Sequence, residues 1–370
     1  MVALVYIFIM KILFFIDKLG SGGAQRQLVN LAISFCSIGH EVEILTYCAD
    51  NFYEKEIALT KIKHVSIPKC GYLKRVLKCR KYIRKGKFDA VISFLETPSF
   101  IAELATIPCH RWVNISGERS SAPRITKTIK GRLLRFAHLF SDYVVANSSY
   151  NLFLVKKACP FLPKRKLQTI YNMYDINGKL SPDNYTKENR NDKKFHLLVA
   201  ASHQKLKNFK NLAIAIKLLP EEKRECIIVD WYGKKVEKCY NDSLKIIQEL
   251  GIEQNFVFYD PTLEIYNKMI NADAVGLFSL YEGLPNAICE AMCLAKPVIA
   301  TNVSDNKLLI DDQQLISEST DPTDISRSLL YLLDSSEEEL QLLGDNNRKK
   351  AMKLFSSEKI IKQYLSLITK

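Results

Sequence analysis

Short apolar runs alternate with amphipathic, helix-length segments along most of this chain, and the alternation limits the folds that it can adopt. In the first half, the runs that suit buried strands are residues 11–16, 41–47, 90–94, 111–115, 143–147 and 168–171. In the second half, they are residues 196–200, 226–232, 255–258, 274–278 and 297–300. Buried strands separated by crossover helices are typical of parallel sheets. The sequence therefore predicts an α/β protein with doubly wound sheets.

A polar segment divides this alternation into two halves of similar size. Residues 176–194 have no apolar periodicity, which indicates a linker. A chain of 370 residues is long enough for two domains with ample cores. We predict Rossmann-like domains over residues 1–175 and 195–350, joined by the linker 176–194. The apolar pattern of residues 351–370 predicts a closing helix.

The first sixteen residues are apolar except for Lys11, which is their only charged residue. A secretory signal would need a basic start and a small-residue cleavage site, and the run has neither. It is also too short, and too interrupted by Lys11, for a membrane span. We interpret residues 10–16 as the first buried strand, with either Met1 or Met10 as the true start.

Positive charge is concentrated in the first half. Residues 1–180 contain 28 Lys and Arg against 12 Asp and Glu, whereas residues 181–370 contain 25 against 28. One acid-free basic group comprises Lys69, Lys74, Arg75, Lys78, Arg80, Lys81, Arg84, Lys85 and Lys87. Apolar residues at helical spacing accompany it: Tyr72, Leu73, Val76, Leu77 and Ile83. A second basic group comprises Arg124, Lys127, Lys130, Arg132 and Arg135.

A basic amphipathic surface suits an anionic membrane, to which each nearby charge contributes roughly 1 kcal/mol. We therefore predict that residues 69–87 and 124–135 bind such a membrane surface. The alternative is a solvated helix face whose apolar side packs on the sheet. Nucleic acid is another anionic partner, but no nucleic-acid-binding motif accompanies the charge, so we predict none.

Ten cysteines are scattered along the chain without a Cys-x-x-Cys pair, and no paired histidines have metal-ligand spacing. This pattern favours reduced thiols and argues against a disulfide framework or a zinc site. The sequence therefore predicts no metal site.

Two carboxylates, Glu282 and Glu290, lie eight residues apart between a strand-like run and a helix-like run. The turn between them contains Gly283, Leu284, Pro285 and Asn286. The turn is expected at the carboxyl end of a strand, where open α/β sheets bind ligands and free amides favour phosphate. Asn286 is expected as the N-cap of the following helix. Apolar neighbours flank Glu290, so a solvated surface role suits it poorly.

Glu-x7-Glu with Glu-Gly-Leu-Pro-Asn, followed by Glu-Ala-Met and Lys-Pro-Val-Ile-Ala, resembles the donor-nucleotide signature of the retaining glycosyltransferases of family 4. The resemblance implies the GT-B fold, with two Rossmann-like domains, an interdomain cleft and a closing helix that returns to the first domain. It also implies that Glu290 binds ribose hydroxyls and that Glu282 holds the transferred sugar. Gly283, Leu284, Pro285 and Asn286 would complete this donor-binding segment.

Two further segments are similar to parts of the family pattern. Gly22, Gly23 and Gln25 match a Gly-Gly-Ala-Glu loop on the acceptor side, where Gln25 replaces the usual glutamate. Lys207 matches a lysine that neutralises the donor diphosphate, whereas Ser202 stands where an arginine is usual. Lys205 could take over that charge or be a surface lysine.

The segment that contains Arg119 and the loop 302–306 depart from the family pattern. Arg119 follows a strand where many relatives carry a histidine; it could clamp phosphate or form a surface ion pair. The loop 302–306 lacks the common paired glycines. His110 and His203 are interpreted as structural.

The resemblance implies a retaining transferase that moves a hexose or N-acetylhexosamine from a UDP-sugar to a lipid-linked or lipopolysaccharide acceptor. Glu282, Lys207 and Arg119 would be catalytic, without a metal or other cofactor. Such an enzyme would act in lipopolysaccharide, O-antigen or capsule assembly, peripheral on the inner face of the cytoplasmic membrane. The alternatives are a soluble sucrose-phosphate or trehalose-type transferase, a GT-B protein that binds without turnover, and a non-catalytic nucleic-acid-binding protein.

Overall fold

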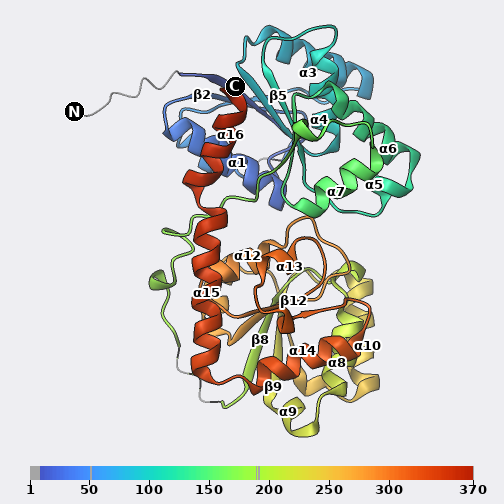
Figure 1. The fold of residues 1–370 in the computed structure, drawn as a ribbon, viewed down its shortest axis with the longest axis vertical. Coiled ribbons are helices and arrows are strands. Elements are labelled where there is room, and N and C mark those ends of the chain that lie inside the picture. The colour runs from blue at the N-terminus through green and yellow to red at the C-terminus, as the bar shows by residue number, and fades with distance from the viewer. Residues whose placement is uncertain (1–8, 51, 189, 191, 370) are drawn as a thin grey trace, which may run out of the picture. The chain divides into compact units, whose positions relative to one another are not determined.

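The computed structural model describes residues 9–369, apart from residues 51, 189 and 191. The chain forms two compact units: Met1–Met173 with Ser357–Lys370, and Tyr174–Ser356. Each unit contains one parallel sheet with helices on its faces (Figure 1). The predicted α/β class with two Rossmann-like units is therefore confirmed.

The first unit is built on a seven-stranded sheet in the order β3-β2-β1-β4-β5-β6-β7. Its strands are β1 (Lys11–Phe15), β2 (Glu41–Thr46), β3 (Lys63–Ser66), β4 (Ala90–Phe94), β5 (Val113–Glu118), β6 (Tyr143–Ala146) and β7 (Leu167–Thr169). Its α-helices are α1 (Gly23–Ser37), α2 (Glu54–Ala58), α3 (Tyr72–Lys85), α4 (Glu96–Thr106), α5 (Arg124–Lys127), α6 (Ile129–Phe136), α7 (Ser149–Ala158) and α16 (Ser357–Ile368).

Alternating side chains of β1 supply two separate cores, one on each face of the sheet. Ile12 and Phe14 pack in the cluster that contains residues of α1 and α16. Leu13 and Phe15 pack in the cluster that contains residues of α3 and α4. Every one of these four side chains is fully buried, which is why this part of the sequence is a continuous apolar run.

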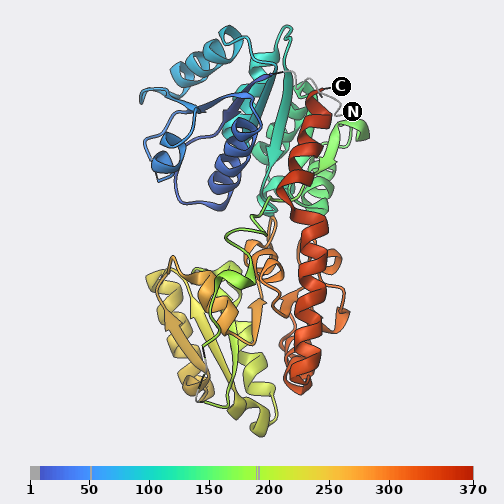
Figure 2. The same cartoon turned by 90° about the vertical axis from the view of Figure 1, so that its left-hand side faces the viewer.

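The second unit has a six-stranded sheet in the order β10-β9-β8-β11-β12-β13. Its strands are β8 (Phe195–Ala200), β9 (Ile227–Tyr232), β10 (Phe256–Tyr259), β11 (Ala274–Leu277), β12 (Val298–Thr301) and β13 (Ile316–Ser317). Its α-helices are α8 (Phe209–Leu218), α9 (Glu221–Cys226), α10 (Glu237–Leu250), α11 (Ile265–Asn271), α12 (Asn286–Cys293), α13 (Asn306–Leu309), α14 (Pro322–Asp334) and α15 (Glu337–Phe355). The long α15 packs against α12 (Figure 2).

The structure differs from the sequence-based expectations at several boundaries. β3 and β13 were not predicted, because they are short and lack a clear apolar run. The described part of segment 176–194 belongs to the second unit and contains the 3-10 helix Pro182–Asn184. The closing helix of the first unit begins at Ser357 rather than at residue 351, because α15 continues to Phe355.

Within the described ranges, we find no helix with the length and apolar character needed to cross a bilayer. The predicted first strand corresponds to β1, while the choice between Met1 and Met10 falls partly on residues outside the described part. All ten cysteines have free thiols.

Candidate functional site

The sheet of the second unit reverses its strand order between β8 and β11, which are hydrogen-bonded neighbours. Loops that leave two such strands at their carboxyl ends diverge and leave room for a ligand. The loop after β8 carries Lys207, and the loop after β11 carries Glu282. The sheet topology therefore brings together two residues that are 75 positions apart in the sequence.

Lys207 and Glu282 form an ion pair through the Lys207 ammonium and Glu282 Oε1. The Ser279 hydroxyl donates a hydrogen bond of 2.6 Å to the same carboxylate oxygen. Both charged side chains are mostly buried, with 19% and 15% exposed. Partial burial strengthens their attraction relative to a surface pair. A cation and an anion are thus held in fixed positions at the edge of the sheet.

Glu290 lies on the first turns of α12 and is 6% exposed. The Tyr266 hydroxyl lies 3.5 Å from Glu290 Oε1. Burial raises the pKa of the neighbouring Cys293 thiol well above its usual value, and the Glu290 carboxylate raises it further. Glu290 is therefore an internal carboxylate rather than a solvated surface charge.

The predicted N-cap of α12 is wrong by one residue. Pro285 occupies the cap, and Asn286 is the first helical residue. Instead of capping, Asn286 Oδ1 accepts a hydrogen bond of 2.7 Å from the Tyr174 hydroxyl. Leu284 and Pro285 are buried, which anchors the turn that begins at Gly283.

The loop after β12 supports the same turn. The Ser304 hydroxyl donates a hydrogen bond to the carbonyl oxygen of Gly283. Ser304 has a φ of 54°, in the left-handed region that favours glycine. Ser304 lies in the loop 302–306, which lacks the paired glycines of the family pattern, and its side chain holds the Gly283 turn through this hydrogen bond.

Ser202 and Lys205 lie elsewhere in the loop after β8. The backbone of Ser202 lies close to that of Gly233. A Cβ added to Gly233 would lie 1.9 Å from Ala201 O and 2.9 Å from Ser202 N. Lys205 is exposed and lines a separate cavity between α8 and α10. Gly233 was missed by the sequence analysis, although its position directly after β9 was an available signal.

Two family models match this chain. Residues 182–350 match the family model "Glycosyl transferases group 1", and residues 21–177 match "Glycosyltransferase Family 4". The chain belongs to glycosyltransferase family 4.

Two curated relatives from Campylobacter jejuni match this glycosyltransferase over nearly its full length. A GalNAc-α-(1→4)-GalNAc-α-(1→3)-diNAcBac-PP-undecaprenol α-1,4-N-acetyl-D-galactosaminyltransferase is 27% identical, and the match covers 97% of this chain and 98% of the relative. An N-acetylgalactosamine-N,N'-diacetylbacillosaminyl-diphospho-undecaprenol 4-α-N-acetylgalactosaminyltransferase is 24% identical, with 97% and 99% covered. Both relatives are named for lipid-linked glycan acceptors.

The fold is similar to that of a solved structure from Anabaena, HepE in complex with UDP and glucose. The TM-score is 0.81 at 18% sequence identity, with 97% of this chain and 99% of HepE covered. This similarity confirms the GT-B fold.

In the first unit, the glycosyltransferase has a second cavity of about 240 Å³ at the carboxyl ends of β1, β4 and β5. The strand order also reverses there, between β1 and β4. Asp17, Glu96, Glu118 and Arg119 contribute to its lining. Gln25 Nε2 lies 3.4 Å from Asp17 Oδ1, so the predicted glycine loop is connected to this cavity.

The glycine loop begins α1. Gly22 is the N-cap, and Gly23 is the first helical residue. A Cβ on Gly22 would lie 2.2 Å from Gln25 Oε1. Gly22 therefore leaves the space that the buried Gln25 side chain occupies.

Arg119 lines the cavity but makes contacts that were not predicted. Its guanidinium donates hydrogen bonds of 3.0 Å to Asn172 Oδ1 and to the Tyr364 hydroxyl. It also lies over the Phe94 ring, 3.7 Å from the ring centroid. These contacts connect the end of β5 to α16. Arg119 belongs to the first unit and Lys207 to the second.

A buried ionic network lies next to the same cavity and was missed by the sequence analysis. Arg135 donates to Glu96 at 2.7 Å and to Glu118 at 2.8 Å. His138 bridges Glu103 at 2.5 Å and Glu118 at 2.9 Å. The inclusion of Arg135 in the basic surface is therefore wrong, because its side chain is fully buried.

The network determines how its members ionise. Burial alone would raise the pKa of Glu118, but the charges of Arg135 and His138 lower it to about 2. Burial alone would lower the pKa of His138, but the charges and hydrogen bonds of Glu103 and Glu118 raise it to about 9. Glu118 is thus an anion at neutral pH and His138 a cation, so neither is available as a general base there.

No cluster of three or more His, Cys, Asp or Glu side chains within the described ranges has a geometry that could hold a metal ion.

Proposed function

We propose that this glycosyltransferase moves a hexose or N-acetylhexosamine from a UDP-sugar to a lipid-linked glycan acceptor, with retention of anomeric configuration. The observation that carries the proposal is the arrangement of Lys207, Glu282 and Glu290 around the reversal point of the second sheet. UDP is the nucleotide bound in the HepE structure, and lipid-linked acceptors are named for both Campylobacter relatives.

In this proposal, the second unit binds the donor. Glu290 accepts hydrogen bonds from ribose hydroxyls, and Glu282 accepts them from the transferred sugar. Lys207 and the amides at the start of α12 stabilise the negative charge that develops on the departing diphosphate. Since these groups are fixed before the reaction, little reorganisation is needed as the sugar bond breaks.

Retention is proposed to proceed by front-face attack, assisted by the leaving group. In the second unit, Glu282 is held by Lys207 and Ser279, so its Oε1 is engaged in polar contacts. This suits a carboxylate that positions sugar hydroxyls better than one that attacks the anomeric carbon. A metal-independent reaction remains part of the proposal, with Lys207 as the cation at the diphosphate.

The acceptor is proposed to bind the first unit. The cavity at β1, β4 and β5 contains the carboxylates of Asp17, Glu96 and Glu118, which are suited to hydrogen bonds from sugar hydroxyls or amides. Both oxygens of Glu118 are engaged by Arg135 and His138, so Asp17 and Glu96 are the carboxylates proposed to face the acceptor.

The basic helices of the first unit support membrane association. On α3, Val76 and Ile83 are buried, whereas Leu73 and Leu77 are 76% and 65% exposed. On α6, Ile129 and Leu133 are 80% and 63% exposed. The exposed pairs are four residues apart and therefore share a helix face. Exposed lysines accompany them on both helices: Lys74, Lys81 and Lys130.

Apolar side chains next to lysines on exposed helix faces suit the interface of an anionic membrane. We therefore propose that the enzyme is peripheral on the cytoplasmic face of the membrane and acts in lipopolysaccharide, O-antigen or capsule assembly. Arg80 and Arg84 were predicted to belong to the membrane-binding surface. Their guanidinium groups instead donate hydrogen bonds to the carbonyl oxygens of Leu104 and Ala105 near the end of α4.

The test is a thermal-shift and calorimetric panel of UDP-, GDP- and ADP-sugars with the wild type and Glu290→Ala. A UDP-sugar is expected to raise the melting temperature of the wild type, because ligands that bind the folded state stabilise it. Glu290→Ala is expected to bind at least ~10-fold more weakly through loss of the ribose contacts, and to lose transfer.

Glu264→Ala is the matched control, because Glu264 is an exposed glutamate of the same unit. It is expected to bind and transfer like the wild type. Wild-type transfer by Glu290→Ala would contradict the proposed role of Glu290. Stabilisation by GDP- or ADP-sugars alone would contradict the proposed donor.

A further inference from the structure

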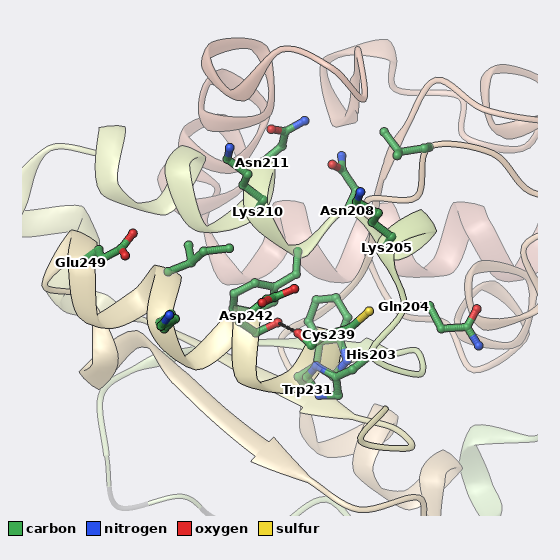
Figure 3. Close-up of a pocket in the computed structure, with 15 residues that line it drawn as sticks. His203, Gln204, Lys205, Asn208, Lys210, Asn211, Trp231, Cys239, Asp242 and Glu249 are labelled. Atoms are coloured by element: carbon green, nitrogen blue, oxygen red, sulfur yellow. Dashed lines mark hydrogen bonds between the residues drawn. The ribbon is translucent and has the colours of Figure 1, made fainter. Parts of the chain in front are cut away.

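A cavity of about 450 Å³ lies between α8 and α10 in the second unit. Cys239, Ser243, Ile246 and Glu249 form one wall, at the spacing of a single helix face. The first turn of α8 forms the opposite wall (Figure 3). Neither Lys207, Glu282 nor Glu290 lines this cavity, so it is separate from the proposed donor site.

His203 lies at the bottom of the cavity beside Trp231 (Figure 3). The His203 side chain belongs to a residue that is only 2% exposed, and neither ring nitrogen has a hydrogen-bond partner among the described residues. A neutral imidazole carries one donor and one acceptor, and buried polar atoms of this kind are normally paired. An unpartnered, buried polar side chain in the lining of a cavity of ligand size therefore indicates a bound polar group.

The surroundings of His203 determine the kind of group that it would bind. Its ring lies 5.3 Å from Trp231, 5.1 Å from Tyr240 and 5.2 Å from Phe258 between centroids. Burial, together with the charge of Lys235, lowers the pKa of His203 to about 4. His203 is thus neutral at pH 7 and would recognise a ligand by hydrogen bonding rather than by charge.

The rim of the cavity is charged, in contrast to its bottom. Lys205, Lys210 and Lys245 line it together with Asp242 and Glu249, and all five side chains belong to exposed residues. The lysines outnumber the carboxylates by one. The cavity therefore suits a compound with a polar ring and an anionic substituent: the ring reaches His203, and the anionic group stays near the lysines.

We propose that this cavity is a second ligand site for an anionic ring compound of about the size of a nucleoside monophosphate. A volume of about 450 Å³ is in the ordinary range for small-molecule sites. Trp231 and Phe209 supply apolar surface for the ring, and His203 supplies the hydrogen bond.

The site has a structural connection to the proposed donor site. The rim residue Lys205 begins the 3-10 helix Lys205–Lys207, and Lys207 at the end of this helix forms the ion pair with Glu282. The amide of the rim residue Leu280 donates a hydrogen bond of 2.8 Å to Leu206 O in the same turn. A ligand in the cavity would therefore contact the turn that positions Lys207.

The experiment uses Trp231 as the reporter. Trp112 belongs to the first unit, so the full-length Trp112→Phe protein retains Trp231 as its single tryptophan. UMP and AMP are titrated separately, with inorganic phosphate as a probe that lacks a ring. At least one nucleotide is expected to change Trp231 fluorescence saturably below millimolar concentration, and phosphate is expected to have no effect.

Two further variants distinguish the sites. In the same background, Glu290→Ala is expected to keep the response, because Glu290 does not line the cavity. His203→Leu is expected to weaken it at least ~10-fold through loss of the hydrogen bond. Absence of a saturable response to either nucleotide, loss of the response in Glu290→Ala, or an unchanged response in His203→Leu would overturn the proposal.

A rim variant keeps the test valid if His203→Leu fails to fold. Lys210→Glu is expected to weaken binding several-fold by reversing a rim charge, whereas Lys217→Glu should have no effect. Lys217 is an exposed lysine on α8 outside the cavity. Equal affinities for the two variants would contradict the site. The donor proposal is tested independently by UDP-sugar binding to the wild type.

Discussion

The Lys207 ammonium forms an ion pair with Glu282 Oε1, and these groups come from loops that follow two neighbouring parallel strands. The same oxygen accepts a hydrogen bond from Ser279. Glu282 therefore positions the cation that is proposed to face the diphosphate, and Lys207 fixes the carboxylate that is proposed to face the sugar.

We predict that Lys207→Met and Glu282→Gln each lower kcat/KM by about 10²–10³-fold, because Lys207 is proposed to face the charge that develops on the diphosphate and Glu282 to hold the transferred sugar. The double variant is expected to lose less than the product of the two effects. Directly contacting residues usually couple by about 0.5–3 kcal/mol. The measurement is a double-mutant cycle of transfer rates, with melting temperatures recorded to exclude unfolding.

Lys217→Met is the control for this cycle, because Lys217 is an exposed lysine of the same unit. It should leave kcat/KM unchanged. Strictly multiplicative losses in the double variant would show that the pair does not act as a unit.

Ser304 provides a test of how the Gly283 turn is held. Ser304→Ala should destabilise the fold by about 1 kcal/mol, because it loses the hydrogen bond to Gly283 and keeps the left-handed backbone. Ser304→Gly loses the same bond but relieves a strain of about 1 kcal/mol, so its net effect should be smaller.

Both Ser304 variants are expected to bind the donor more weakly, since each releases the Gly283 carbonyl. Urea denaturation measures the free energy of unfolding, and calorimetry measures donor affinity. An equal loss of stability in the alanine and glycine variants would show that the positive φ carries no strain.

The sequence allowed the main strands and the burial of Glu290 to be predicted, because both depend on local patterns of apolar residues. β1 is a continuous apolar run, and Glu290 is surrounded by apolar neighbours on α12. The pairing of Lys207 with Glu282 required the sheet order as well. Only the adjacency of β8 and β11 brings their loops together.

Arg135 shows why other features could not be predicted. On sequence alone it belongs to a run of basic residues, and four neighbours in that run suggest a surface. Its partners Glu96 and Glu118 come from α4 and β5, far away in the sequence. Burial of a charge depends on such nonlocal partners, whereas helical periodicity reports only one element at a time.

The network around His138 predicts a specific pH dependence of stability. The pKa of His138 is about 9 in the folded protein and near 6.5 in the unfolded chain, so its contribution is complete below pH 6.5 and is lost as the pH rises through 9. The pKa of Glu118 is about 2 when folded and near 4.5 when unfolded, so its contribution is complete above pH 4.5 and is lost toward pH 2.

We therefore expect these two groups to stabilise the first unit most between pH 4.5 and 6.5, with a decline toward pH 9. His138→Gln should lower the free energy of unfolding at pH 6 and flatten the decline between pH 6.5 and 9. Urea denaturation at several pH values measures both effects. His110→Gln is the control, because His110 contacts Asp142 outside the network. An unchanged alkaline slope in His138→Gln would contradict the assignment.

Leu73 and Leu77 test membrane association, because both are exposed on α3 beside lysines. The double variant Leu73→Ser/Leu77→Ser should bind anionic liposomes about 10-fold more weakly, through loss of the apolar contribution to interfacial binding. Wild-type binding should also fall as salt rises, since the lysines contribute electrostatically. Co-sedimentation with anionic and with neutral liposomes measures the apolar and the electrostatic contribution to binding.

Leu59→Ser is the matched control, because Leu59 is 90% exposed but lies outside the two basic helices. If the wild type shows no salt-sensitive binding to anionic liposomes, or if Leu59→Ser weakens binding as much as the double variant, α3 is not the membrane-binding surface.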